Sequence, residues 1–307
     1  MSIESSALTL TDEPQAALYR AQTSLEGLSV GDAFGEQFFL PPEDFEVAVT
    51  TRTVPSAPWS WTDDTQMALS VVAVLAAHGE IASDALAQSF ATHFDPSRGY
   101  GPSMGRAVRQ IQNGADWRVV VQKAFGGQGS YGNGSAMRAG PIGAYFAPDL
   151  ERMVTQARVT HTHPEAVAGA VAVAVASAIC TRNAATGRQV SALTFLDEVQ
   201  GWLPPSEVAG KIRRARDMPA RASLAFAASI LGNGVQLSAQ DTVPFALWCA
   251  SRHLDDVEAA LWLAVSAGGD RDTICAIVGS IVQLAAPQTL PAAWQLAREP
   301  LPELFDA

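Results

Sequence analysis

Two short acidic motifs, far apart in the sequence, hold the side chains best suited to chemistry. The first is Thr62-Asp63-Asp64-Thr65, and the second is Gly268-Gly269-Asp270-Arg271-Asp272-Thr273. Carboxylates gathered in apolar surroundings repel one another and resist burial unless cations neutralise them. Carboxylate and hydroxyl oxygens are the ligands that hard divalent cations prefer. The two motifs together therefore predict a two-metal site for Mg²⁺ or Mn²⁺.

Each motif also fits an ordinary helix N-terminus, because each precedes an apolar run with helical spacing. Thr and Asp are favoured there as caps and as partners of the helix dipole. One motif alone favours capping, whereas the pair favours a metal site. Gly268 and Gly269 also let the backbone approach closely. The expected metal ligands are Thr62, Asp63, Asp64, Asp270, Asp272 and Thr273.

The stretch from Gly126 to Arg138, glycine-rich as far as Gly134, looks like a loop that runs into a helix and is the candidate for ligand binding. Such a loop can present several backbone N–H groups to a phosphate, particularly where it runs into a helix. Tyr131 adds a flat face for a base or a ribose. A plain flexible turn is an equally good explanation of the glycines.

Asp32 and His161 are two further candidates for contact with a ligand. Asp32 lies in a stretch of small and apolar residues, where a carboxylate needs a partner; close helix packing with one polar interruption is the alternative. His161 and His163 are two residues apart, but no third nitrogen or sulfur ligand is evident, which disfavours zinc. His161 fits a hydrogen bond to substrate, with helix capping or plain exposure as the alternatives.

The apolar periodicity predicts an all-α fold. Helices are expected over residues 65–77, 84–92, 104–111, 149–159, 164–181, 207–216, 220–231, 243–251, 255–266 and 272–285. The segment 164–181 contains a strand-like alternation, but its length and alanine content favour a buried helix. Glu46 to Val54 is the best candidate strand. No repeat, linker or composition shift divides the chain, so we expect residues 1–307 to form a single compact domain of about a dozen helices around an apolar centre.

Composition and charge narrow the class of protein. With 48% hydrophobic and 17% charged residues, the chain of 307 residues is globular. A net charge of −11 argues against duplex nucleic acid as a partner. Cys180, Cys249 and Cys275 lie in apolar runs and are expected to be free thiols in a reducing compartment. No signal peptide is evident, and the apolar run 166–180 is too short to span a membrane, so we expect a cytoplasmic protein. We also expect it to be a monomer.

Five motifs in this order resemble the ADP-ribosylglycohydrolase family. They are GDAFG at 31–35, WTDDT at 61–65, GNGSAMR at 132–138, THTHPEA at 160–166 and GGDRDT at 268–273, and the resemblance covers about residues 20–290. The family includes the dinitrogenase reductase-activating glycohydrolase and hydrolases of ADP-ribosyl-arginine and ADP-ribosyl-serine. The residues from Gly129 to Gly134 look most similar to those of the ADP-ribosyl-serine hydrolases.

The resemblance implies an all-α domain with a binuclear Mg²⁺ or Mn²⁺ centre. It implies hydrolysis of the N- or O-glycosidic bond at C1 of the distal ribose, which releases ADP-ribose from a modified protein or small molecule. Catalytic roles are expected for Asp64, Glu36 and Asp270. Substrate contacts are expected from Asp32, Gly129, Ser130, Tyr131, Gly132, Asn133 and His161.

The chain departs from the family pattern at one position of interest. Many members carry a glutamate four residues beyond the last glycine of GDAFG, and here that residue is Phe39. Glu36 is the nearest carboxylate, and Arg271 stands where a small residue is common. Two other functions therefore stay open: a non-catalytic relative that binds ADP-ribose or serves a structural role, and a metal-dependent phosphohydrolase that cuts the diphosphate.

Overall fold

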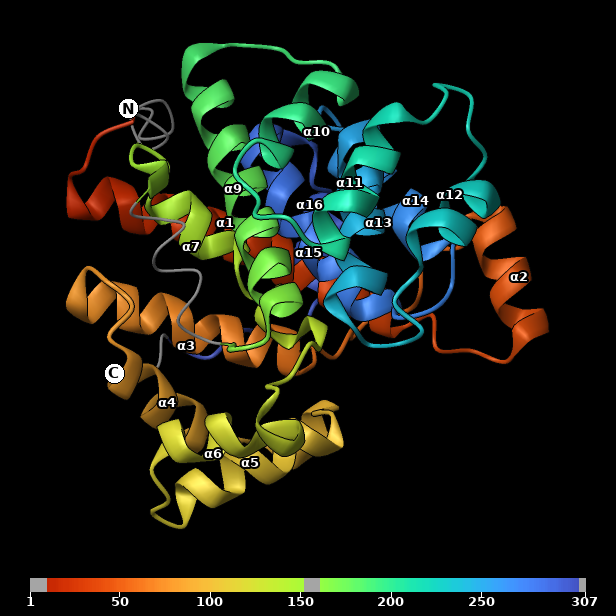
Figure 1. Cartoon of the computed structure of the whole chain (residues 1–307). Coiled ribbons are helices and arrows are strands. Elements are labelled where there is room, and N and C mark those ends of the chain that lie inside the picture. Colours follow the sequence, from red (N-terminus) through yellow and green to blue (C-terminus); the bar gives the residue numbers. More distant parts are fainter. Residues whose placement is uncertain (1–9, 152–160, 304–307) are drawn as a thin grey trace.

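Two helices in backbone contact, α1 (Pro14–Glu36) and α15 (Arg271–Ala285), form the centre of the fold (Figure 1). The computed structural model describes residues 10–151 and 161–303. The two helices run antiparallel, since Gly27, Gly31 and Gly35 of α1 face Gly279, Cys275 and Arg271 in turn. A Cβ atom on Gly279 would lie 2.1 Å from the carbonyl oxygen of Gly27, so only glycine permits this approach. The pairing brings the C-terminal end of α1 to the N-terminal end of α15.

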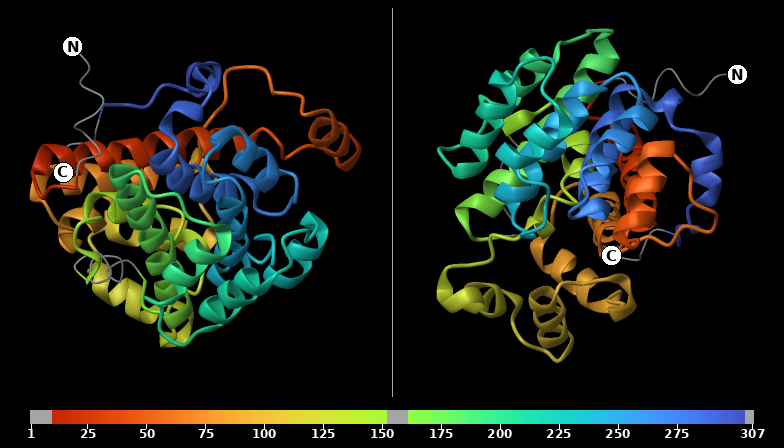
Figure 2. Two further views of the ribbon diagram at one scale, coloured as in Figure 1. Left: turned by 90° about the horizontal axis from the view of Figure 1, so that it is seen from above. Right: turned by 90° about the vertical axis from the view of Figure 1, so that its right-hand side faces the viewer.

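Five further helices pack around this pair and complete the apolar core (Figure 2). They are α3 (Asp63–His78), α7 (Gly140–Tyr145), α9 (Pro164–Thr186), α13 (Ala239–Arg252) and α14 (Val257–Val265). The N-terminal ends of α3 and α15 carry the two acidic motifs. The core helices thereby position the candidate site.

The remaining helices lie at the periphery. Helices α4 (Ser83–Thr92), α5 (Pro102–Gln112) and α6 (Trp117–Lys123) form a separate lobe at the bottom of Figure 1. Helices α10 (Ala192–Gln200), α11 (Glu207–Asp217) and α12 (Leu224–Leu231) cover another side, and the short α2 (Pro42–Thr51) and α16 (Ala292–Ala297) complete the set. No β-strand occurs in the described ranges, which confirms the all-α prediction.

The expected strand over Glu46 to Val54 is wrong, because this segment lies mostly in α2. Pro41 and Pro42 set the backbone for a helix start, and Glu43 and Asp44 favour the first turn electrostatically. The helix expected from residue 220 begins instead at Leu224, where Ser223 accepts a hydrogen bond as the N-cap. The helix expected over 149–159 lies largely outside the described residues.

Helix α9 is a core helix that extends further than its apolar run. It continues to Thr186, which makes it long and apolar enough to cross a bilayer by length and composition. However, 83% of its apolar window is buried against other helices. The predicted buried helix is thus confirmed, and its burial accounts for its hydropathy.

We expect Gly279→Ala to destabilise the protein, because the added methyl group would overlap the backbone of Gly27. Overpacking of this kind costs about 1–3 kcal/mol of unfolding free energy. The matched control is Gly210→Ala in α11, where an added Cβ meets no atom within 4 Å. The control should gain roughly 0.5–1 kcal/mol. Chemical denaturation of both variants measures the difference, and equal stability would contradict the close packing.

Candidate active site

One cavity of about 480 Å³ lies between the α4–α6 lobe and the core helices. Its walls differ sharply in chemistry. One wall carries the carboxylates Asp63, Asp64, Asp270 and Asp272. The opposite wall is apolar and comes from the lobe, including Phe90, Met104, Val108, Val120 and Val121. A ligand in this cavity would meet charge on one side and apolar surface on the other.

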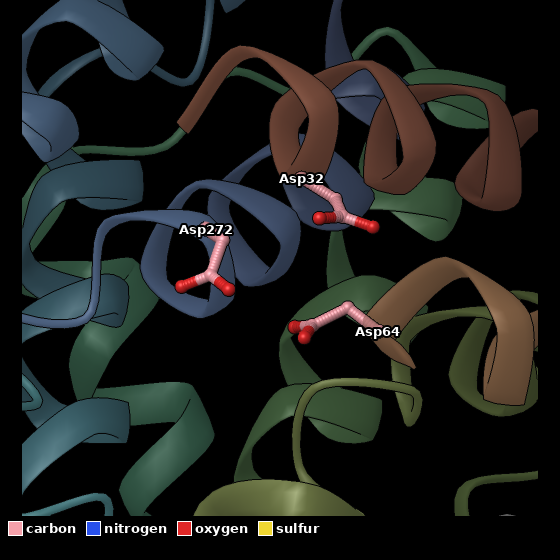
Figure 3. Close-up of side chains that lie close together, drawn as sticks. All are labelled: Asp32, Asp64 and Asp272. Atoms are coloured by element: carbon pink, nitrogen blue, oxygen red, sulfur yellow. The ribbon is translucent and has the colours of Figure 1, made fainter. Parts of the chain in front are cut away.

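Three carboxylates converge near the acidic wall, and two of them, Asp64 and Asp272, line it. Oxygens of Asp32, Asp64 and Asp272 lie within 4.8 Å of one another. Figure 3 shows their side chains projecting from α1, α3 and α15 toward a common space. The antiparallel pairing of α1 with α15 places Asp32 beside Asp272, and α3 delivers Asp64.

Asp32 holds the first acidic motif in position through hydrogen bonds. Its carboxylate accepts hydrogen bonds from the backbone N–H and hydroxyl of Thr62 (2.9 and 2.8 Å) and from those of Thr65 (3.1 and 2.5 Å). Asp32 has no exposed surface and does not line the cavity. This placement differs from the expected substrate contact, because Asp32 lies behind Asp64 and holds the start of α3 in position.

The turn before α15 is built around Asn233 and Asn133. Gly269 has φ of +70°, and a Cβ atom there would lie 1.9 Å from the carbonyl oxygen of Asn233. The same carbonyl accepts a hydrogen bond of 3.0 Å from the backbone N–H of Asp270. The side-chain amide of Asn133 donates to the Asp270 carboxylate at 2.6 Å. The glycine-rich loop is therefore tied directly to the second acidic motif.

The carboxylates have strongly perturbed acidities. Burial, followed by the charges of neighbouring carboxylates, raises the pKa of Asp63 to about 8. Burial also raises the pKa of Asp64 and Asp270 well above the ordinary value, with nearby carboxylates adding to the effect. For Asp32, burial outweighs the hydrogen bonds from the threonines and raises the pKa to about 6. The cluster resists ionisation unless positive charge joins it.

The donor set fits a divalent cation. One buried oxygen each of Asp64 and Asp272 has no hydrogen-bond partner among the described residues. Unpaired buried carboxylate oxygens are costly, and hard cations satisfy them. Thr273, at 3.5 Å from Asp64, adds a hydroxyl oxygen on the cavity wall, whereas Thr62 is buried beside Asp32 and does not line the cavity.

The glycine-rich loop forms a third part of the cavity. Ser130, Tyr131, Gly132, Asn133 and His161 all line it, as expected for ligand contacts. Gly129 does not line the cavity. The structure thus brings five of the seven predicted substrate-binding residues to one surface.

Backbone hydrogen bonds to a segment distant in sequence fix the loop in place. The backbone N–H of Asn133 donates to Leu237 at 3.1 Å, and that of Ala239 donates to Tyr131 at 2.9 Å. Tyr131 is 47% exposed, and its ring packs edge-on against His163 with centroids 5.4 Å apart. His163 caps α9 by accepting from the N–H of Glu165, so the capping role weighed for His161 belongs to His163.

Glu36 lies at the C-terminal end of α1, half-buried and outside the cavity wall. Burial, aided by the charges of Asp272 and Asp32, raises its pKa to about 7. Phe39 is half exposed. The guanidinium of Arg271 lies 5.1 Å from the Phe39 ring and 4.3 Å from the Phe45 ring. Arg271 therefore anchors α2 and is not among the residues that line the cavity.

Sequence reasoning overlooked several residues of the site. Thr65, inside the first motif, is a main partner of Asp32. Leu237 lines the cavity and had no local signal. Arg138 lines the cavity with only 1% exposure; it ends the GNGSAMR motif at 132–138, but no role was assigned to it.

We expect the stability of the metal-free protein to fall as pH rises. The folded carboxylates hold protons that the unfolded chain releases, since their pKa values are raised to about 6 for Asp32 and about 8 for Asp63. The free energy of unfolding therefore decreases between the unfolded pKa and those folded values. Thermal melts in EDTA should show a lower Tm at about pH 8 than at about pH 5.5.

Divalent cations should reverse this loss. Mg²⁺ or Mn²⁺ at a hundredfold excess over Kd would add about 2.7 kcal/mol to the free energy of unfolding. The rise in Tm should be larger at the higher pH, and Asp64→Asn should reduce it. A Tm in EDTA that is independent of pH, with no shift on adding cations, would contradict the fit of the cluster to a cation.

Comparisons with known proteins agree with this geometry. The human ADP-ribosylhydrolase ARH3 is 26% identical over 92% of this chain and 90% of its own length. The ADP-ribosylarginine hydrolase Tri1 of Pseudomonas putida is 33% identical over 54% of this chain and 47% of its own length. A solved structure, an ADP-ribosylglycohydrolase-related protein complex, shares the fold with a TM-score of 0.61 at 21% identity, covering 92% of this chain and 93% of that one. The ADP-ribosylglycohydrolase family profile matches residues 13–305, and the chain belongs to that family.

Proposed function

We propose that this protein hydrolyses the glycosidic bond of an ADP-ribosyl group and releases ADP-ribose, with two Mg²⁺ or Mn²⁺ ions at the acidic wall. The observation that carries the proposal is the convergence of Asp32, Asp64 and Asp272 in a member of the ADP-ribosylglycohydrolase family. Asp64 and Asp272 each have a buried oxygen without a hydrogen-bond partner among the described residues. The glycine-rich loop lies in the same cavity. The acidic motifs and the loop expected to bind phosphate thus share one cavity.

The cations would be held by residues that line the cavity: the carboxylates of Asp63, Asp64, Asp270 and Asp272 and the hydroxyl of Thr273. When bound, the cations would supply a template that orients the ribose hydroxyls and a water molecule. Asp32 keeps Asp64 in place through Thr62 and Thr65. The backbone of the loop would bind the diphosphate.

In the reaction, the oxygen of water bonds to C1 of the distal ribose while the C1–N or C1–O bond to the modified group breaks. The leaving group keeps the bonding electrons and gains the proton that the water molecule loses, so the reaction consumes one water overall. Carboxylates near C1 stabilise the oxocarbenium-like transition state. Asp64 and Asp272 would be engaged as ligands, so we assign removal of the water proton to Glu36, whose raised pKa suits a base near neutral pH. Because Glu36 lies outside the cavity wall, it would take the proton through one bridging water molecule.

Product identity tests the proposal. Purified protein would be incubated with arginine-linked and serine-linked ADP-ribosyl peptides, O-acetyl-ADP-ribose and poly(ADP-ribose), with Mg²⁺, Mn²⁺ or EDTA. Metal-dependent release of ADP-ribose from one of them is the expected result, and the reactive substrate names the linkage. Release of AMP with ribose phosphate would indicate a phosphohydrolase. Binding of ADP-ribose without turnover of any substrate would indicate a non-catalytic relative.

We expect Asp64→Asn and Asp272→Asn to lower kcat by about 10²–10³-fold or more, because each removes one charge from the converging cluster while keeping side-chain shape. Steady-state kinetics would measure the loss. Asp197→Asn serves as the control, since this carboxylate is exposed and pairs with Arg216 away from the cavity. Wild-type turnover in either cluster variant would contradict the assignment.

We expect Glu36→Gln to lower kcat by about 10²–10⁴-fold, the usual contribution of a general base. The base must be ionised, so wild-type kcat should rise with pH through the pKa of Glu36, which bound cations would bring to or below about 7. This acid limb of the pH profile should disappear in the variant. Glu43→Gln on exposed α2 is the matched control. Retention of both rate and acid limb in Glu36→Gln would assign the base elsewhere.

A further inference from the structure

Arg138 is the only lysine or arginine among the described residues that line the cavity. It follows the glycine-rich loop closely in sequence and is 1% exposed. Burial of a guanidinium is costly unless its donors find partners. The contacts of Arg138 therefore indicate why an arginine occupies this wall.

These contacts join the loop to the helix that carries the first acidic motif. One terminal nitrogen, Nη1, donates to the carbonyl oxygen of Gly134, in the loop, and lies 3.4 Å from the sulfur of Met67, in α3. The guanidinium carbon lies 4.8 Å from the centroid of the Phe90 ring in α4. The Nε atom is buried with no hydrogen-bond partner among the described residues.

The charge of Arg138 also faces the acidic wall. Burial lowers its pKa to about 10, and the neighbouring Tyr100, Asp63 and Asp64 oppose that effect. Arg138 makes no ion pair with either aspartate at contact distance among the described residues. The guanidinium thus stands beside the carboxylates without occupying their oxygens.

A second buried arginine shows what a purely structural role looks like in this fold. Arg20 is 0% exposed, and its Nε donates to Ala144 at 3.0 Å. Its Nη2 donates to the carbonyl oxygens of Tyr145 and Thr11 at 3.0 and 3.2 Å. Arg20 does not line the cavity. Arg138, by contrast, contacts the loop through Nη1 while its Nε has no hydrogen-bond partner among the described residues.

We propose that Arg138 is a positioning residue that fixes Gly132–Gly134 against the N-terminal end of α3, so that the ligand-binding loop keeps a set distance from Asp63 and Asp64. The hydrogen bond from Asn133 to Asp270 fixes the same loop against α15. The loop is thereby held between both acidic motifs. This inference rests on the proposed function for its consequence, which is affinity for the ADP-ribosyl group.

Three variants test the assignment: Arg138→Met, Arg138→Lys and the matched control Arg20→Met. Hydrogen exchange of loop amides, followed by mass spectrometry without ligand, reports directly on the tether. We expect at least tenfold faster exchange over residues 130–137 in Arg138→Met and an intermediate effect in Arg138→Lys, which keeps the charge but has a single donor nitrogen. Arg20→Met should lower Tm and leave exchange in this segment unchanged.

Ligand binding supplies the second measurement. With Mn²⁺ present, calorimetry should show at least tenfold weaker ADP-ribose binding by Arg138→Met, with KM raised more than kcat is lowered. Unchanged loop exchange in Arg138→Met, or equal loosening in Arg20→Met, would overturn the positioning role. If Arg138→Met does not fold, Arg138→Lys decides, because wild-type exchange and affinity in that variant would also overturn it. Wild-type protein that neither binds nor releases ADP-ribose would refute the proposed function. The exchange measurement would still test whether Arg138 fixes the loop.

Discussion

Repulsion among buried carboxylates is the interaction on which this structure depends. Asp32, Asp64, Asp270 and Asp272 are gathered from α1, α3 and the start of α15 into a largely apolar interior. The pKa values of Asp32, Asp64 and Asp270 are raised by burial first and by repulsion from neighbouring carboxylates second. Folded proteins tolerate such a cluster when positive charge or hydrogen bonds compensate it. Here four hydrogen bonds satisfy Asp32, whereas Asp64 and Asp272 each keep an unpaired oxygen.

The rest of the fold supplies the rigidity that this arrangement needs. The glycines of α1 and Gly279 of α15 allow the two backbones to touch, which fixes Asp32 beside Asp272. The hydrogen bonds of Asp32 then fix the start of α3, and Asn133 joins the glycine-rich loop to Asp270. A small set of short-range contacts thus determines the distances among all parts of the site. The apolar lobe of α4–α6 completes the cavity on the opposite side.

The sequence predicted the helical class and the two acidic motifs, because apolar periodicity and local residue type carry those signals. Helix α9 was expected from its length and alanine content, and it is a core helix. The segment 46–54 was misjudged because short apolar runs do not distinguish a strand from an exposed helix such as α2. The roles of Asp32 and Arg138 depend on contacts with residues distant in sequence, such as Thr62 and Met67, so local patterns do not reveal them. Phe39 was noticed as a departure, but its contact with Arg271 emerges only in three dimensions.

A crystal structure of the protein grown with Mn²⁺ and ADP-ribose, with anomalous scattering recorded at the manganese edge, would show whether the carboxylate cluster binds two cations beside the substrate. We expect two anomalous peaks on the cavity wall, within bonding distance of the unpaired oxygens of Asp64 and Asp272, with the distal ribose against them. Asp32 should keep its hydrogen bonds to Thr62 and Thr65. Absence of manganese from the cluster, with ADP-ribose bound elsewhere or not at all, would contradict a two-metal site that binds the ADP-ribosyl group.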